Sequence, residues 1–164
     1  MSEPRDGTTQ ADVDFPLWRL LDHTRYMIFR MRERELAGFS LTPEQAFVLD
    51  IIHASGGSTT INRIVEMSQH RHNSISALIN RMAKQGLLKK NRTRRDKRAF
   101  RIVSTAKGEE LLGRASRGSV HDAFSCLELG EKRQLEVLLN RLMVSAYSAS
   151  GVSLPDFPPP SGNN

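Results

Sequence analysis

Cysteine and long hydrophobic runs are both scarce in this chain of 164 residues. Its single cysteine, Cys126, excludes a disulfide framework within the chain and favours a reducing compartment. No run of 18 apolar residues predicts a membrane span, and the polar segment 1–14 lacks the apolar core of a signal peptide. A chain of this length forms one domain that is large enough to bury a hydrophobic core. Together, these absences lead us to expect a cytoplasmic protein.

Motifs of catalysis are missing as well. The sequence contains no Gly-x-Ser-x-Gly, no Walker loop, no Gly-x-Gly-x-x-Gly and no His-Glu-x-x-His. His70 and His72 flank Arg71 without a nearby cysteine, so a metal cation would meet a positive field there. His23, His53 and His121 are isolated in the sequence, which leaves open a metal site formed by histidines from different helices. We expect no enzyme, no cofactor and no metal.

Positive charge is concentrated in one stretch. Residues 84–101 contain nine Lys or Arg and one Asp, a net +8, whereas the whole chain carries +6, so the remainder sums to −2. An apolar stripe at helical spacing lies just before it and consists of Ile75, Leu78, Ile79 and Met82. The opposite face of this predicted helix carries no carboxylate. A basic run is often only a solvated surface, but beside such a face it favours nucleic-acid contact.

A hairpin should follow this helix. Gly86 is placed to end the helix, and the basic run then leads to a return segment, residues 99–103. Phe100 and Ile102 fall on one side of that segment at a period of two, so we expect a strand with Phe100 facing inward. A short helix followed by a basic hairpin is the layout of a winged helix-turn-helix DNA reader. The predicted fold class is therefore mainly α with a small β-hairpin wing.

Three groups of residues are candidates for DNA contact, and the groove assignments follow from their chemistry. The recognition helix would place in the major groove Asn73, Ser74, Ser76, Ala77, Asn80, Arg81 and Lys84. The turn before it would bring three side chains close to phosphate oxygens, those of His70, Arg71 and His72. The wing would supply Arg92, Arg94, Arg95, Lys97 and Arg98. Asn80 suits adenine and Arg81 guanine or phosphate, while Arg94 and Arg95 at the wing tip suit a narrow minor groove.

Helical patterns flank this reading head on both sides. A helix is expected to start near Asp14 and Pro16 and to end near Gly38, with an apolar stripe from Leu17 to Met31. Thr42 and Gln45 form a capping box, and the helix that follows should bury Phe47, Val48, Ile51 and Ile52. Thr59-Thr60 should begin the next short helix, with Ile61, Ile64 and Val65 inward.

Beyond the wing, Thr105 is placed to cap a helix with Leu111, Leu112 and Ala115 on one side. Leu129-Gly130 should break the pattern. A last amphipathic helix, centred on residues 135–142, should pack against the N-terminal helix of its own chain or of a partner. Cys126 lies between Phe124 and Leu127, which favours a buried, inert thiol over an oxidation sensor.

The order of several short motifs resembles the MarR family of bacterial transcription regulators, over about residues 12 to 147. These motifs are Leu41-Thr42-Pro43-Glu44-Gln45, Gly56-Gly57, Ser74-Ile75-Ser76, Asn80-Arg81-Met82, Lys84-Gln85-Gly86-Leu87-Leu88, Asp96-Lys97-Arg98 and Ser104-Thr105-Ala106-Lys107-Gly108. The resemblance implies a homodimer built from the terminal helices and a sequence-specific regulator, expected to be a repressor on a pseudo-palindromic operator in double-stranded DNA. It also implies that Asp96 pairs with a nearby arginine, Arg98, and holds the wing in shape.

A small-molecule effector between the dimer helices and the reading head is a further implication of the resemblance, with His23, Met27 and Met31 as candidate lining residues. The expected organisation is a disordered N-terminus (1–11), a dimerisation helix (12–38), a winged helix-turn-helix head (39–104), C-terminal dimerisation helices (105–149) and a disordered Pro-rich tail (150–164). The rival interpretation is a basic RNA- or ribosome-associated module. It is weaker because such readers stack bases on aromatic side chains, and the basic stretch has only Phe100.

Overall fold

The computed structural model describes residues 10–68, 70–92, 100–115 and 117–155 of the chain. These residues form a mainly helical fold with one small antiparallel sheet, which confirms the fold class predicted from the sequence. The elements, in chain order, are α1 (Gln10–Ala37), α2 (Pro43–Ala54), β1 (Ser58–Thr60), α3 (Ile61–Ser68), α4 (His72–Lys84), β2 (Leu88–Arg92), β3 (Phe100–Ser104), α5 (Ala106–Arg114), α6 (Gly118–Phe124) and α7 (Leu129–Ser150).

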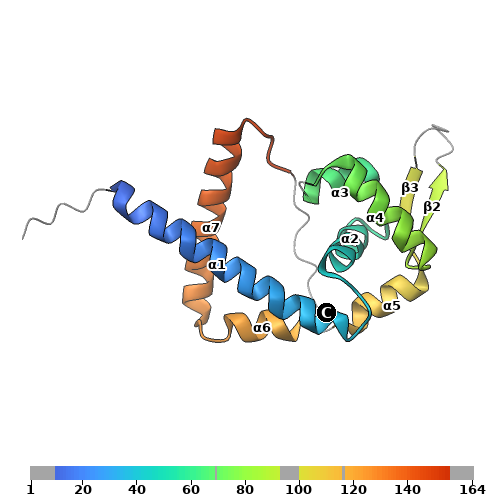
Figure 1. Ribbon diagram of the computed structural model, residues 1–164, viewed down its shortest axis with the longest axis horizontal. Helices are drawn as coiled ribbons and strands as arrows, with labels where there is room; N and C mark the ends of the chain where they lie inside the picture. The colour runs from blue at the N-terminus through green and yellow to red at the C-terminus, as the bar shows by residue number, and fades with distance from the viewer. Residues whose placement is uncertain (1–9, 69, 93–99, 116, 156–164) are drawn as a thin grey trace, which may run out of the picture.

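The molecule has two parts that α1 joins, as Figure 1 shows. Helices α2, α3, α4 and the sheet form a head at one end, whereas α7 crosses the other half of α1. The fully buried side chains belong almost entirely to the head and include Leu49, Ile52, Ile64, Ile79 and Ile102. The core of this single chain is therefore the core of the head.

Local sequence signals explain how the head is divided into elements. The Thr42 hydroxyl accepts a hydrogen bond from the Gln45 amide at 3.3 Å, and the Gln45 side chain accepts one from the Thr42 amide at 2.9 Å. This is the capping box predicted at the start of α2. Gly86, with φ of 72°, ends the segment after α4, because the left-handed conformation there costs glycine little.

The sheet has the strand order β1-β3-β2, with both pairs antiparallel. Ile102 lies in the middle strand between Thr59 and Lys90, so these three side chains share the face that covers the core. Thr59-Thr60 were predicted to begin a helix; α3 does begin directly after them, at Ile61, but Ser58–Thr60 themselves form the third strand of the sheet. Three residues are too few to show a period, and only pairing with β3 makes them a strand.

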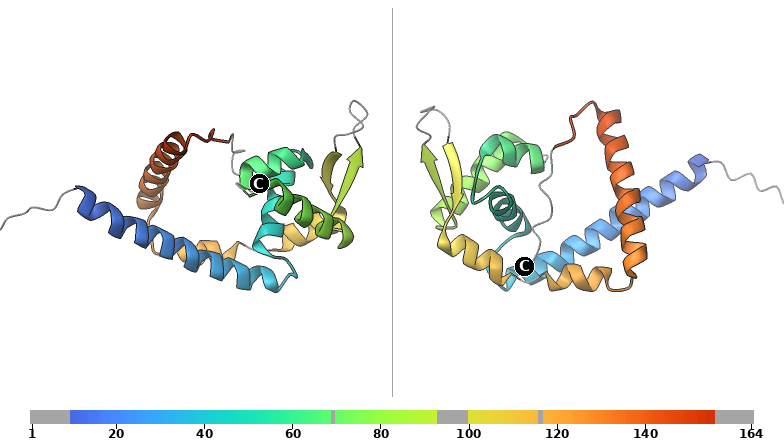
Figure 2. Two further views of the ribbon diagram at one scale, coloured as in Figure 1. Left: turned by 45° about the horizontal axis from the view of Figure 1, so that its top comes forward. Right: turned by 180° about the vertical axis from the view of Figure 1, so that it is seen from behind.

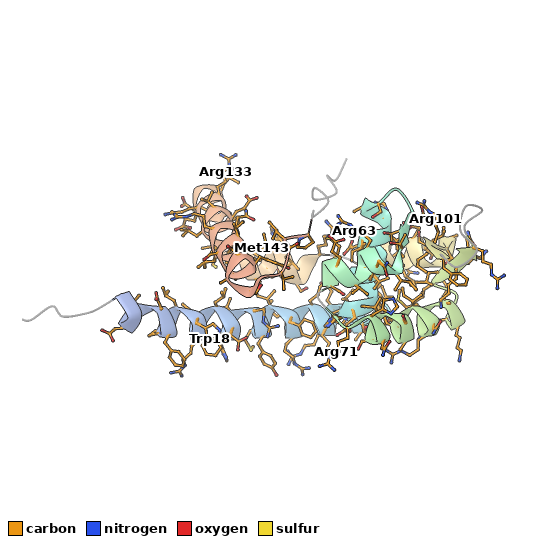
Figure 3. All side chains as sticks on the ribbon, turned by 90° about the horizontal axis from the view of Figure 1, so that it is seen from above. Trp18, Arg63, Arg71, Arg101, Arg133 and Met143 are labelled. Atoms are coloured by element: carbon orange, nitrogen blue, oxygen red, sulfur yellow. The ribbon has the colours of Figure 1, made fainter. Side chains whose placement is uncertain are left out.

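The terminal helices are much more exposed than the head. Helix α1 packs against α6, and none of the described residues of α7 is buried. Figures 2 and 3 show α7 standing apart from most of α1. Exposed apolar side chains on the two helices include Leu17, Trp18, Leu20, Leu138, Leu139 and Leu142. None of the helices described here has the length and hydrophobicity that crossing a membrane requires.

Two predicted helix boundaries are wrong. Helix α1 begins at Gln10, so Pro16 lies inside it, where the proline costs one backbone hydrogen bond in the second turn. Leu129-Gly130 starts α7 instead of breaking the pattern, because Glu128 and Glu131 form a capping box there. A glycine in the first turn of a helix lies beside that cap, where it interrupts few intrahelical bonds.

Three burial predictions are also wrong. Phe47 is 40% exposed, because α2 is buried on nearly all sides and Phe47 falls on its narrow outer strip with Asp50 and Ala54. Phe100 shares the inner face with Ile102 but is 38% exposed, since it lies one residue pair nearer the wing tip, beyond the core. Cys126 is exposed in the turn between α6 and α7.

Candidate DNA-binding surface

Helix α4 divides into a buried face and an open face. Ile75, Leu78, Ile79 and Met82 are buried, as the apolar stripe predicts. All seven predicted contact residues of this helix lie away from that stripe, and six are exposed: Asn73, Ser74, Ala77, Asn80, Arg81 and Lys84. Ser76 is half-buried. Changing a residue on the open face should therefore affect a bound partner more than the core.

The start of α4 differs slightly from the predicted turn. His72 is the first residue of the helix, not the last residue of the turn, and its Nδ1 lies 3.3 Å from the Ser76 hydroxyl one helical turn later. Arg71 occupies the N-cap position without a side-chain capping bond and projects from the head in Figure 3. His70 is exposed. The amide groups at this helix start and the Arg71 charge both favour an anion such as phosphate.

The two sides of α4 have different neighbours. Toward α2, a pocket is lined by side chains that include His70, Ser74, Arg81 and Glu44. Toward the sheet, the Lys90 Nζ donates a hydrogen bond to the Asn80 Oδ1. Asn80 keeps its two amide hydrogens for another acceptor, so it can still offer a donor to a base edge.

Lys90 was counted in the basic run but not assigned to the site. Strand alternation brings it to the helix side, since it pairs with the buried Ile102, and the order Leu88, Lys90, Arg92 at a period of two was a signal for this in the sequence. The structure thus adds a cation beside the open face of α4.

The wing is described only at its base. Arg92 is exposed at the end of β2 and pairs with Phe100. On the opposite sheet face, Arg101 donates to the Ser58 hydroxyl at 2.6 Å. Figure 3 places Arg101 and Arg71 on opposite sides of the head. The predicted contacts of Arg94, Arg95, Lys97 and Arg98, and the pairing of Asp96, lie outside the described residues.

The residues suggested for an effector site belong to α1. His23 lines an open pocket along that helix, beside Trp18 and Asp22, while Met27 is exposed and Met31 half-buried. Met27 and Met31 are not among the residues that line this pocket. No group of three or more His, Cys, Asp or Glu suited to a metal ion occurs within the described part of the chain.

The MarR family model matches residues 39–99, which run from the end of α1 into the wing. No curated protein matches the sequence. Many solved structures share the fold. A mutant of MarR from E. coli in complex with operator DNA superposes with a TM-score of 0.73 at 18% identity, covering 82% of this chain and 99% of the other.

Two further structures cover more of the chain. The organohalide-sensing regulator RdhR-CbdbA1625, in its 2,4-dichlorophenol-bound form, has a TM-score of 0.78 at 22% identity and covers 96% of this chain and 98% of its own. AbsC, a MarR family regulator from Streptomyces coelicolor, has a TM-score of 0.77 at 19% identity, covering 86% and 97%. The sequence identities are low, so these structures show a shared fold only. Their coverage means that this fold includes the terminal helices as well as the head.

Proposed function

We propose that the chain is a winged-helix DNA-binding transcription regulator of the MarR family and acts as a homodimeric, ligand-responsive repressor, since the family model matches residues 39–99 and solved structures share the fold over most of the chain. Each subunit would place α4 in the major groove of one half-site of a pseudo-palindromic operator. The wing would lie along the adjacent minor groove or backbone. Regulators of this family are not enzymes, so the proposed activity is binding alone.

The open face of α4 is the observation that carries the proposal. Its exposed residues are small, amide-bearing or cationic, and none is a carboxylate. Lys90 adds a positive charge from the neighbouring strand. The residues of this face bring no negative charge to polyanionic DNA and can present Asn80 and Arg81 to base edges.

Dimerisation is supported by the exposed apolar side chains of α1 and α7. Phe15 and Trp18 lie with ring centroids 5.4 Å apart on α1, and both are more than half exposed. Leu138 and Leu142 are one turn apart on α7 and exposed too. Two helices with this much exposed apolar surface at one end of the chain fit a surface that a second copy covers. Twofold pairing would present two α4 helices to two half-sites.

Effector binding is supported by the place of α1, which leads from the terminal helices directly into the head. A ligand seated between these parts in the dimer could change the spacing of the two α4 helices. The neighbour with bound 2,4-dichlorophenol makes this phenol a reasonable first probe. A ligand shifts the DNA equilibrium only by its differential affinity for the bound and free forms.

A mobility-shift experiment tests the function. Duplexes selected from a random pool by the wild-type chain should contain an inverted repeat, and a scrambled duplex should bind more weakly. Single-stranded RNA of the same length tests the rival RNA-binding module. Preferential binding to the RNA would contradict the proposal, and exposed Phe100 would then be the first residue to change.

The wing should act mainly through charge. Changing both Arg94→Ala and Arg95→Ala should weaken binding to many sequences alike. The slope of log affinity against log salt should fall by about one to two, at ~0.9 per lost phosphate contact. An unchanged slope would show that neither arginine neutralises a phosphate. Arg114→Ala together with Arg133→Ala, on exposed faces of α5 and α7, gives a control with the same loss of charge.

A further inference from the structure

The turn after the recognition helix, residues 85–87, is bound on one side by α2. The Gln45 Nε2 donates to the Gln85 Oε1 at 2.7 Å. The same Gln45 side chain closes the α2 capping box through its Oε1, and Gln45 is one of two buried polar residues among those described. One amide therefore links the start of α2 to the end of α4.

On the other side, the turn is bound by the first residues of α5. The Lys107 Nζ donates to the Gln85 main-chain oxygen at 2.9 Å, and the Thr105 hydroxyl donates to the Gly86 oxygen at 2.6 Å. The Thr105 amide also donates to the Leu87 oxygen at 3.1 Å. Three consecutive carbonyl groups thus accept hydrogen bonds from two residues of one segment.

Backbone packing makes the same junction tight. A Cβ added at Gly108 would lie 2.2 Å from the Leu87 oxygen, so α5 begins in direct contact with the turn. The Thr105 hydroxyl also accepts from the Gly108 amide at 3.1 Å, which caps α5. Thr105, which caps α5, therefore also forms hydrogen bonds to the turn that follows α4.

We propose that these contacts, the α4–α5 clasp of Gln45, Gln85, Thr105 and Lys107, set the position of the recognition helix for base reading. Thr105 and Lys107 are then positioning residues that touch no DNA. This inference rests on the proposed function. Base recognition depends on holding side chains within about 0.5 Å of their productive position. Hydrogen bonds from two separate elements to the end of α4 restrict its sliding and tilt.

A change at Lys107 distinguishes a positioning role from simple charge attraction to DNA. It is exposed and cationic, so it could instead bind a phosphate. Losing a phosphate contact would lower the salt slope by about 0.9 and weaken all duplexes alike. Losing a positioning contact leaves the slope unchanged and weakens the selected duplex more than the scrambled one.

The variants are Thr105→Val, Thr105→Ser, Lys107→Met and a matched control, Thr60→Val. The Thr60 hydroxyl accepts from the Arg63 amide at 3.2 Å, so the control loses the same type of capping bond away from the clasp. Affinity is measured on the selected and scrambled duplexes across a salt series. Amide hydrogen exchange at residues 85–87 is measured without DNA.

Thr105→Val and Lys107→Met should each lower affinity for the selected duplex by roughly five- to a hundredfold, the range for losing one base contact, with little change on the scrambled duplex. Thr105→Ser should restore binding, and exchange at residues 85–87 should rise in the two clasp variants alone. Losses no larger than for Thr60→Val, or equal losses on both duplexes, would overturn the clasp. If the wild type selects no duplex while exchange still rises, the proposed function fails and the clasp stands as a structural joint.

Discussion

At the scale of single residues, Asn80 combines exposure with an existing hydrogen bond. Its Oδ1 accepts from Lys90, and its side chain points away from the buried stripe of α4. The amide can therefore be removed without opening the core. Any large effect of the change should appear in DNA recognition.

Asn80→Ala should cost roughly 1–3 kcal/mol on the selected duplex, with little loss on a scrambled duplex and little change in salt slope. The free energy of unfolding of this variant should lie within about 0.5 kcal/mol of the wild-type value, since the position is exposed. Asn91→Ala is the control, because Asn91 is an exposed amide on the outer face of the sheet, opposite Arg101. Equal weakening of both duplexes by Asn80→Ala would show that this face does not read bases.

Cys126 should react as an exposed thiol. In one chain it lies open between α6 and α7, with its Sγ 3.8 Å from the Ala123 oxygen. Ellman's reagent added without denaturant should therefore titrate about one thiol per chain. If the thiol reacts only after unfolding, the partner's helices cover this turn in the dimer. Cys126→Ser gives the background rate.

At the scale of elements, the first turn of α5 tests how closely two segments pack. Gly108→Ala should destabilise the fold by about 1–3 kcal/mol, because its Cβ would overlap the Leu87 oxygen. Gly113→Ala, in the same helix with open space around the new methyl group, should stabilise it by up to ~1 kcal/mol. Thermal unfolding of the two variants measures both effects. A neutral Gly108→Ala would mean that α5 moves freely against the turn.

At the scale of the whole molecule, the exposed apolar faces of α1 and α7 predict the assembly. Light scattering at micromolar concentration should give twice the mass of the 18.5 kDa chain. Changing Leu138→Glu with Leu142→Glu should lower that mass or cause aggregation, since a charge buried in an apolar interface is costly. The control is Asn62→Glu, which places a charge at an exposed position of α3. A monomer mass for the wild type would contradict the dimer and remove the basis for a two-half-site operator.

Local signals in the sequence determined much of the head. The α4 stripe, the Gly86 stop and the caps at Thr42 and Thr105 were predicted and are present in the structure. Each depends on residues within one or two helical turns, so periodicity and capping chemistry suffice to find them. The charge of the wing and the open face of α4 could likewise be predicted without knowing the fold.

Tertiary structure alone decided which residues distant in sequence meet. Burial of Phe47, Phe100 and Cys126 was predicted wrongly, because burial depends on whether another element covers a face, and a helical or strand period gives only the direction of a side chain. Lys90 meets Asn80 only through the register of β2 with β3. One hydrogen bond of the clasp joins Gln45 and Gln85, which are 40 positions apart, and no local pattern encodes a contact of that length. The sequence alone determined which residues of α4 are candidates for reading DNA, and the packing of α2, α5 and the sheet around α4 decided how they are held.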